Sequence, residues 1–148
     1  MLDIENFDKK FKSIVSSHKW KRFQEMYNSC DNIFIFGHGG NMAIADHAAI
    51  DMSRLTSKNV MAPGSGVTAA AIISDESFET WIAKWLEFRT KYESDMSRCL
   101  AIGLSCSTTG KSSNCLVNAL EWAKNNGMKT CLLAAQEKEN IDDSILSI

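Results

Sequence analysis

The most constraining feature of the sequence is a run of four large apolar residues, Ile33-Phe34-Ile35-Phe36, that leads straight into a glycine-rich segment. No polar residue interrupts the run, which is typical of a strand covered on both faces, and such strands belong mostly to parallel sheets. Parallel strands need a crossover connection between them, usually a helix. The run therefore predicts an α/β fold.

Short apolar runs and helical patterns continue to alternate along the chain. Further strands are expected at 60–62, 100–104, 130–135 and 144–148, with helices at 42–55, 67–73, 78–92 and 113–126. Residues 1–30 carry apolar side chains at helical spacing and are expected to form one or two amphipathic helices. The prediction is one domain overall. Residues 31–148 form a three-layer α/β/α sandwich with a five-stranded parallel sheet of the flavodoxin-like kind, and residues 1–30 form a helical arm.

Composition narrows the possible partners. The 148 residues include 16 Lys and Arg against 18 Asp and Glu, for a net charge of −2. A nucleic-acid or membrane partner is not expected, because anionic surfaces are held by clusters of positive charge. No apolar run approaches the roughly 18–20 residues that cross a bilayer. The acidic N-terminus is unlike a secretory signal, and five cysteines without a Cys-x-x-Cys pair indicate reduced thiols, so we expect a cytoplasmic protein.

The segment after the first predicted strand is Gly37-His38-Gly39-Gly40-Asn41, and a predicted helix follows it. Glycines let the backbone approach a ligand closely, and the start of a helix offers free N–H groups to an anion. Gly39, Gly40 and Asn41 are therefore candidate binding residues; the alternative is a glycine-rich turn with no ligand. A dinucleotide site is disfavoured, because Met42 stands where the last glycine of Gly-x-Gly-x-x-Gly is required.

The helix that follows carries His47 and Asp51, four residues apart and so on one face. A histidine and a carboxylate in this arrangement can act as an acid–base pair or as two metal ligands. The alternative is an ion pair on the helix surface. Apolar neighbours in the sequence lead us to expect that the helix is largely buried.

A second polar segment, 105–114, follows the third predicted strand and is rich in hydroxyl side chains. Hydroxyls and free backbone N–H groups can surround a phosphate without bulk positive charge. The alternative is a cluster of helix-capping residues. Gly110-Lys111-Ser112 also matches the second half of the nucleoside-triphosphate loop, so a degenerate nucleotide site stays a minor alternative. The candidate binding residues are Ser105, Cys106, Ser107, Gly110 and Ser112.

Together the two segments resemble the sugar isomerase (SIS) domain, and within it the phosphoheptose isomerase family. That family carries Gly-Asn-Gly-Gly-Ser after its first strand, then a His and, four residues on, a Glu; this chain has residues 37–41, then His47 and Asp51. The family's later loop, Gly-Ile-Ser-Thr-Ser-Gly-Asn-Ser-x-Asn, resembles residues 103–114 with an apparent two-residue insertion. The resemblance runs from about Ile33 to Ala135.

The resemblance implies that the chain binds a phosphorylated sugar and isomerises sedoheptulose 7-phosphate between ketose and aldose through an enediol. Such chemistry needs a base, an acid and stabilisation of an oxyanion. By the same resemblance Asp51 would be the base or a metal ligand, His47 a zinc ligand, and Asp75 a substrate contact. The family also implies a homodimer or homotetramer with sites at subunit junctions.

Two departures from the family pattern matter. Asp51 is one methylene shorter than the family's Glu. Family members continue beyond the fifth strand into a helix with a second catalytic His and a Gln, whereas this sequence ends at Ile148. His38 is the internal candidate for the missing acid–base group. The alternative function is a non-catalytic sugar-phosphate sensor or assembly protein on the same fold.

The predicted helix 78–92 carries an aromatic stripe, which is usually a sign of core packing. The members of the stripe are Trp81, Trp85, Phe88 and Tyr92. Together with the N-terminal helices, this gives more apolar helix surface than one small sheet can cover. We therefore expect a homo-oligomer.

Overall fold

The computed structural model describes residues 4–64, 66–106, 111–135 and 146–147, and its centre is a parallel sheet of strand order β2-β1-β3-β4-β5. The strands are β1 (Asn32–Gly37), β2 (Asn59–Met61), β3 (Cys99–Ser105), β4 (Lys129–Ala134) and β5 (Leu146–Ser147). The first four make up almost all of the sheet. A full fifth strand was predicted over 144–148, but β5 is a two-residue pairing beside β4, too short to add substantially to the sheet.

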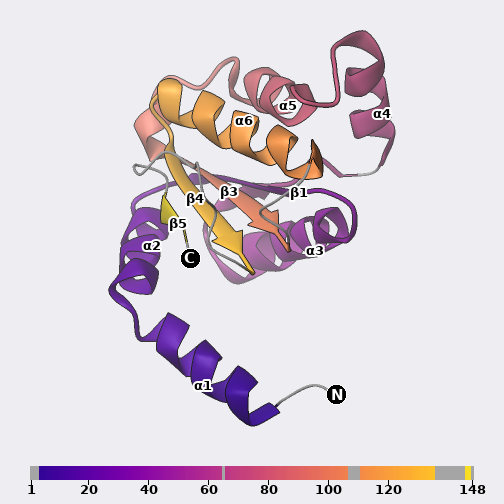
Figure 1. Ribbon diagram of the computed structural model, residues 1–148. Helices are drawn as coiled ribbons and strands as arrows, with labels where there is room; N and C mark the ends of the chain where they lie inside the picture. Colours follow the sequence, from indigo (N-terminus) through magenta and orange to yellow (C-terminus); the bar gives the residue numbers. More distant parts are fainter. Residues whose placement is uncertain (1–3, 65, 107–110, 136–145, 148) are drawn as a thin grey trace.

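Helices lie on both faces of this sheet, as a parallel sheet requires (Figure 1). They are α1 (Ile4–Val15), α2 (His18–Asn28), α3 (Gly40–Leu55), α4 (Gly66–Asp75), α5 (Trp81–Thr90) and α6 (Lys111–Asn125). Helices α2 and α3 cover one face, and α5 and α6 cover the other (Figure 1). A short 3₁₀ helix, Met96–Arg98, precedes β3 and was not predicted. None of the described helices combines the length and the apolar character needed to span a bilayer.

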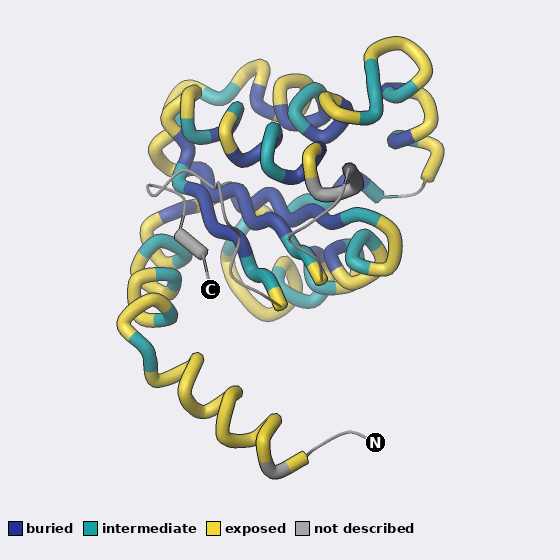
Figure 2. Tube along the Cα trace, viewed as in Figure 1, coloured by how far each residue is buried: buried dark blue, intermediate teal, exposed yellow. Residues whose placement is uncertain are grey.

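Strand β1 shows how the sheet builds two cores. Its side chains alternate between the faces. Ile33 and Ile35 pack with the α2 and α3 side, whereas Phe34 and Phe36 pack with the α4, α5 and α6 side. All four are buried, and the interior strands form the darkest part of Figure 2. The uninterrupted apolar run therefore has the physical cause inferred from the sequence: both faces of the strand are covered.

The aromatic stripe of α5 belongs only partly to the core. Trp81 and Trp85 are each 1% exposed, and the Trp85 ring meets Phe34 edge-on at 5.9 Å. Phe88 is 59% exposed and Tyr92 is 89% exposed. The first half of the stripe therefore packs in the core, and the second half adds to the exposed apolar surface. The helix ends at Thr90, so Tyr92 no longer follows the buried face of α5.

Replacing the buried half of the stripe tests this packing. Trp85→Ala is expected to lower the free energy of unfolding by about 3–5 kcal/mol, because it leaves a cavity against Phe34. Phe88→Ala on the same helix is the matched control and should cost less than about 1 kcal/mol. Urea denaturation followed by circular dichroism measures both. Equal losses for the two variants would contradict the described packing.

Candidate functional site

The direction of the chain switches between two neighbouring strands of the sheet, β1 and β3. From β1 the chain leaves to one face through α3, and from β3 it leaves to the opposite face through α6 (Figure 1). In open α/β sheets such a switch in direction opens a crevice at the carboxyl ends of the strands, and ligands bind there. Strands β1 and β3 pair over six residues, which sets Gly37 beside Leu104. The glycine-rich segment that follows β1 and the hydroxyl-rich segment that follows β3 therefore begin next to each other, at the same edge of the sheet.

The turn from β1 into α3 depends on glycine at two positions. A Cβ on Gly37 would lie 2.6 Å from the backbone carbon of Asn41, so the close approach of strand end and helix excludes a side chain. Gly39 caps α3 with a φ of 60° and a ψ of −127°, a conformation that L side chains rarely adopt. No side chain caps the helix start. Within the first turn, the Asn41 and Met42 N–H groups donate to the His38 and Gly39 carbonyls at 3.2 and 3.0 Å. The positive end of the helix dipole still lies at this edge of the sheet.

One contact joins the two predicted segments directly. The Cys106 thiol donates to the Asn41 Oδ1 at 3.3 Å. Cys106 is exposed and Asn41 is half-buried, so this contact lies at the surface of the molecule. The backbone of Ser105 is held in turn by Ala135, whose N–H donates to the Ser105 carbonyl at 3.1 Å. The structure thus brings Asn41, Ser105 and Cys106 to one place, as the sequence predicted for two converging segments.

His38 lies in the same turn, and its ring is fixed by an aromatic neighbour. The His38 ring meets Phe78 edge-on, with centroids 5.0 Å apart and planes at 81°. The Nδ1 atom is buried and has no hydrogen-bond partner among the described residues. Sequence reasoning missed Phe78 as a site residue, because it counted this residue with the helix of the aromatic stripe. Only the tertiary structure brings it against His38.

His47 and Asp51 lie against each other on the surface of α3 rather than in a buried constellation. His47 Nε2 lies 3.1 Å from Asp51 Oδ2, with the two side chains 81% and 42% exposed. Arg54 also reaches Asp51, at 3.9 Å. The expectation of a largely buried helix is wrong: only Ala45 and Ala49 of α3 are buried. Alanine and isoleucine residues occur all around α3, so the sequence alone could not show which side of this helix packs on the sheet.

These two residues do not by themselves make a zinc site. Catalytic zinc takes three protein ligands and structural zinc takes four. Over the residues that the structure describes, no group of three or more His, Cys, Asp or Glu side chains could hold a metal. His47 and Asp51 supply two donors, and each is already engaged with the other. We therefore derive no step of the chemistry through zinc.

The other predicted binding residues are placed as follows. Asp75 is the exposed last residue of α4, with no hydrogen bond or ion pair to any described residue. Gly40 is the exposed first residue of α3. Ser107 and Gly110 lie outside the described residues, as does the Lys111 side chain of the possible nucleotide loop. Ser112 falls in the first turn of α6, but its side chain is outside the description.

Comparison with known proteins supports the fold. No protein-family model matches the chain, and no curated protein matches it. Among solved structures, the chain is similar to a phosphoheptose isomerase from Francisella tularensis, with a TM-score of 0.60 and 16% sequence identity. The match covers 99% of this chain and 84% of that protein. The chain thus shares the fold of a phosphoheptose isomerase.

The cysteines give a chemical test of the site. Of the five free cysteines only Cys106 is exposed, and burial raises the pKa of Cys99 to about 11 and that of Cys131 to about 12. Those buried thiols stay protonated at neutral pH and react slowly. A disulfide reagent should therefore modify one thiol rapidly in the native protein and all five in denaturant. The Cys106→Ser variant should lack this rapidly modified thiol. If one thiol still reacted rapidly in that variant, another cysteine would be exposed.

Proposed function

We propose that the chain is a phosphosugar isomerase that interconverts the ketose and aldose forms of a heptose phosphate of the sedoheptulose 7-phosphate type. The observation that carries this proposal is the convergence of the β1 and β3 segments, joined by the contact between Cys106 and Asn41. The shared fold with a phosphoheptose isomerase supports it.

The crevice offers the donors that a phosphate ester needs. Helix α3 starts there with an uncapped first turn, and α6 starts at Lys111, just after the β3 segment. Two helix starts supply N–H groups and partial positive charge, which hold a phosphate without a cluster of basic side chains. The proposal places the phosphate between Gly39, Gly40 and Asn41 on one side and residues 105–112 on the other. The slightly acidic net charge of the chain is compatible with this mode of binding.

Proton transfer is assigned to His38. It lies in the turn between β1 and α3, and Phe78 restricts the orientation of its ring. Asp51 lies ten residues beyond Asn41 on α3, which at the helical rise is about 15 Å along the axis. His38 is therefore better placed than Asp51 to move a proton between adjacent sugar carbons at the crevice. Backbone N–H groups of the same turn would stabilise the enediol oxygen.

The assignment is tested by aldose formation from sedoheptulose 7-phosphate. His38→Asn should lower kcat by about 100-fold or more, because a positioned acid–base group contributes that much. His18→Asn, the same change at the start of α2, is the matched control and should leave kcat unchanged. If Asp51→Asn lowered kcat and His38→Asn did not, the proton-transfer group would lie on the surface of α3 rather than in the turn after β1. No turnover by the unmodified chain would refute the isomerase proposal.

One observation favours binding without turnover as a second candidate function. Among the described residues of the two segments, His38 is the only histidine or carboxylate. Isomerisation needs both an acid and a base, although one group can serve in both roles by returning the same proton. A sugar-phosphate sensor would need neither. Thermal stabilisation by sedoheptulose 7-phosphate without aldose formation would favour the sensor, since a ligand specific to the folded state raises its stability.

The proposal includes self-association of the chain. Helix α1 projects from the rest of the molecule and is exposed along its length (Figures 1 and 2). Its apolar residues repeat at intervals of three and four and are between 44% and 71% exposed; they are Ile4, Phe7, Phe11 and Ile14. A helix of 12 residues is marginal in water unless its apolar face is covered. The same stripe on a second copy provides a matching cover.

Light scattering at several protein concentrations tests the association. The chain is expected to have a mass above 16.5 kDa that falls on dilution, and the double variant Phe7→Ser, Phe11→Ser should be a monomer at every concentration. The control is Lys9→Ser, Lys10→Ser, which changes exposed residues of α1 outside the apolar stripe. A monomeric unmodified chain, or a double phenylalanine variant with unchanged mass, would contradict the proposal.

A further inference from the structure

The turn between β1 and α3 contains a polar atom whose burial needs a physical cause. The Nδ1 atom of His38 is buried and has no hydrogen-bond partner among the described residues. Burying a polar nitrogen without a partner costs free energy, so most buried polar atoms in proteins have a donor or an acceptor beside them. The other ring nitrogen, Nε2, is not among the buried atoms that lack a partner. The two nitrogens of this ring therefore lie in different surroundings.

The neighbour of the His38 ring is aromatic. The centroids of the His38 and Phe78 rings are 5.0 Å apart, and their planes cross at 81°. In such an edge-to-face pair, one ring directs the hydrogens of its edge at the electron-rich face of the other. An imidazole N–H that points at this face makes an N–H···π hydrogen bond. Such a contact supplies an acceptor to a buried N–H that has no oxygen or nitrogen partner.

The turn between α4 and α5 holds Phe78 in place. Phe78 is half-buried and packs against the core on the α4, α5 and α6 side of the sheet. The hydroxyls of Ser77 and Thr80 share a hydrogen bond across this turn at 2.9 Å. Asn118 of α6 donates from Nδ2 to the Glu79 carbonyl at 3.0 Å, which ties the turn to that helix. A ring that is anchored through both its side chain and its backbone can fix the orientation of the ring beside it.

We infer that the Nδ1–H group of His38 donates to the face of the Phe78 ring, which makes Phe78 a positioning residue for proton transfer. With the proton held on Nδ1, the neutral imidazole keeps a free electron pair on Nε2. Nε2 takes the proton as the C–H bond of one sugar carbon breaks, and returns it to the neighbouring carbon. While Nε2 holds that proton the ring is a cation, which the face of Phe78 attracts. The role in proton transfer rests on the isomerase proposal, whereas the tautomer does not.

Nitrogen NMR of the full chain, labelled at histidine and without substrate, measures the tautomer. At alkaline pH, where histidine rings are neutral, His38 should carry its proton on Nδ1, and exposed His18 should show the tautomer mixture of free histidine. Phe78→Leu should return His38 to the pattern of His18, because leucine fills space without offering an acceptor. Phe78→Tyr should keep the proton on Nδ1. Phe88→Leu, at a phenylalanine of α5 that is 59% exposed, is the matched control and should leave His38 unchanged.

Kinetics with sedoheptulose 7-phosphate connect the contact to the reaction. Phe78→Leu should lower kcat about tenfold and change KM by less than about twofold, because the ring orientation matters at the proton transfer and not for holding the phosphate. Phe78→Tyr should retain kcat.

The inference is overturned if His38 carries its proton on Nε2 in the unmodified chain, or if Phe78→Leu leaves the tautomer unchanged. It is overturned equally if the chain turns over and Phe78→Leu has an undiminished kcat. A chain that shows the Nδ1–H tautomer and its loss in Phe78→Leu, but forms no aldose, would support the contact and refute the isomerase proposal alone.

Discussion

The pairing of β1 with β3 is the interaction on which the rest of the structure depends. It runs in register over six residues and ends with Gly37 opposite Leu104. A shift of one residue would exchange the faces of Phe34 and Phe36 with those of Ile33 and Ile35, and so place large rings against the α3 side. Each set of β1 side chains fits only the core on its own face, so side-chain packing fixes the register of β1 and β3. The register in turn places the two polar segments at one edge of the sheet.

Helix α3 connects that edge to a second part of the molecule. Its first turn opens on the crevice, while Asp46 and Ser53 further along fix the turn after β2 and the edge of that strand. The helix is thus anchored by side-chain hydrogen bonds on one side and by Ala45 and Ala49 against the sheet. Rigid attachment of this kind matters for binding, because donors that are already in place lose little freedom when a ligand arrives.

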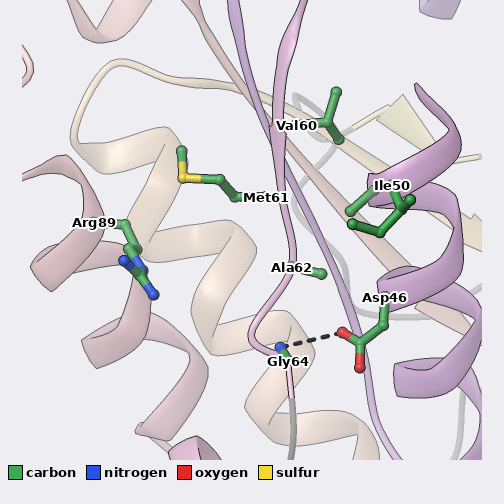
Figure 3. Close-up of a pocket in the computed structure, with 8 residues that line it drawn as sticks. Asp46, Ile50, Val60, Met61, Ala62, Gly64 and Arg89 are labelled. Atoms are coloured by element: carbon green, nitrogen blue, oxygen red, sulfur yellow. Dashed lines mark hydrogen bonds between the residues drawn. The ribbon is translucent and has the colours of Figure 1, made fainter. Parts of the chain in front are cut away.

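The parts of this structure that could be predicted from the sequence are those set by local pattern. The run Ile33–Phe36 predicted a covered parallel strand, and the glycines after it predicted the turn from that strand into a helix. The features that could not be predicted depend on tertiary geometry. The contact of Phe78 with His38 and the hollow at the β2 edge lined by Asp46 and Arg89 (Figure 3) join residues from different elements. The exposure of His47 depends on which side of α3 packs on the sheet. The spacing of residues along the sequence does not show which side chains of different elements come into contact.

The central claim is that a phosphorylated sugar binds where the β1 and β3 segments meet. A crystal structure of the chain with sedoheptulose 7-phosphate tests it most directly. The account predicts phosphate density between the backbone at Gly39 to Asn41 and the segment that begins at Ser105, with the first two sugar carbons nearest His38. Density for the phosphate at the β2 edge, on the surface of α3 beside His47, or with Asn41 and Cys106 on separate sides of the molecule would contradict it.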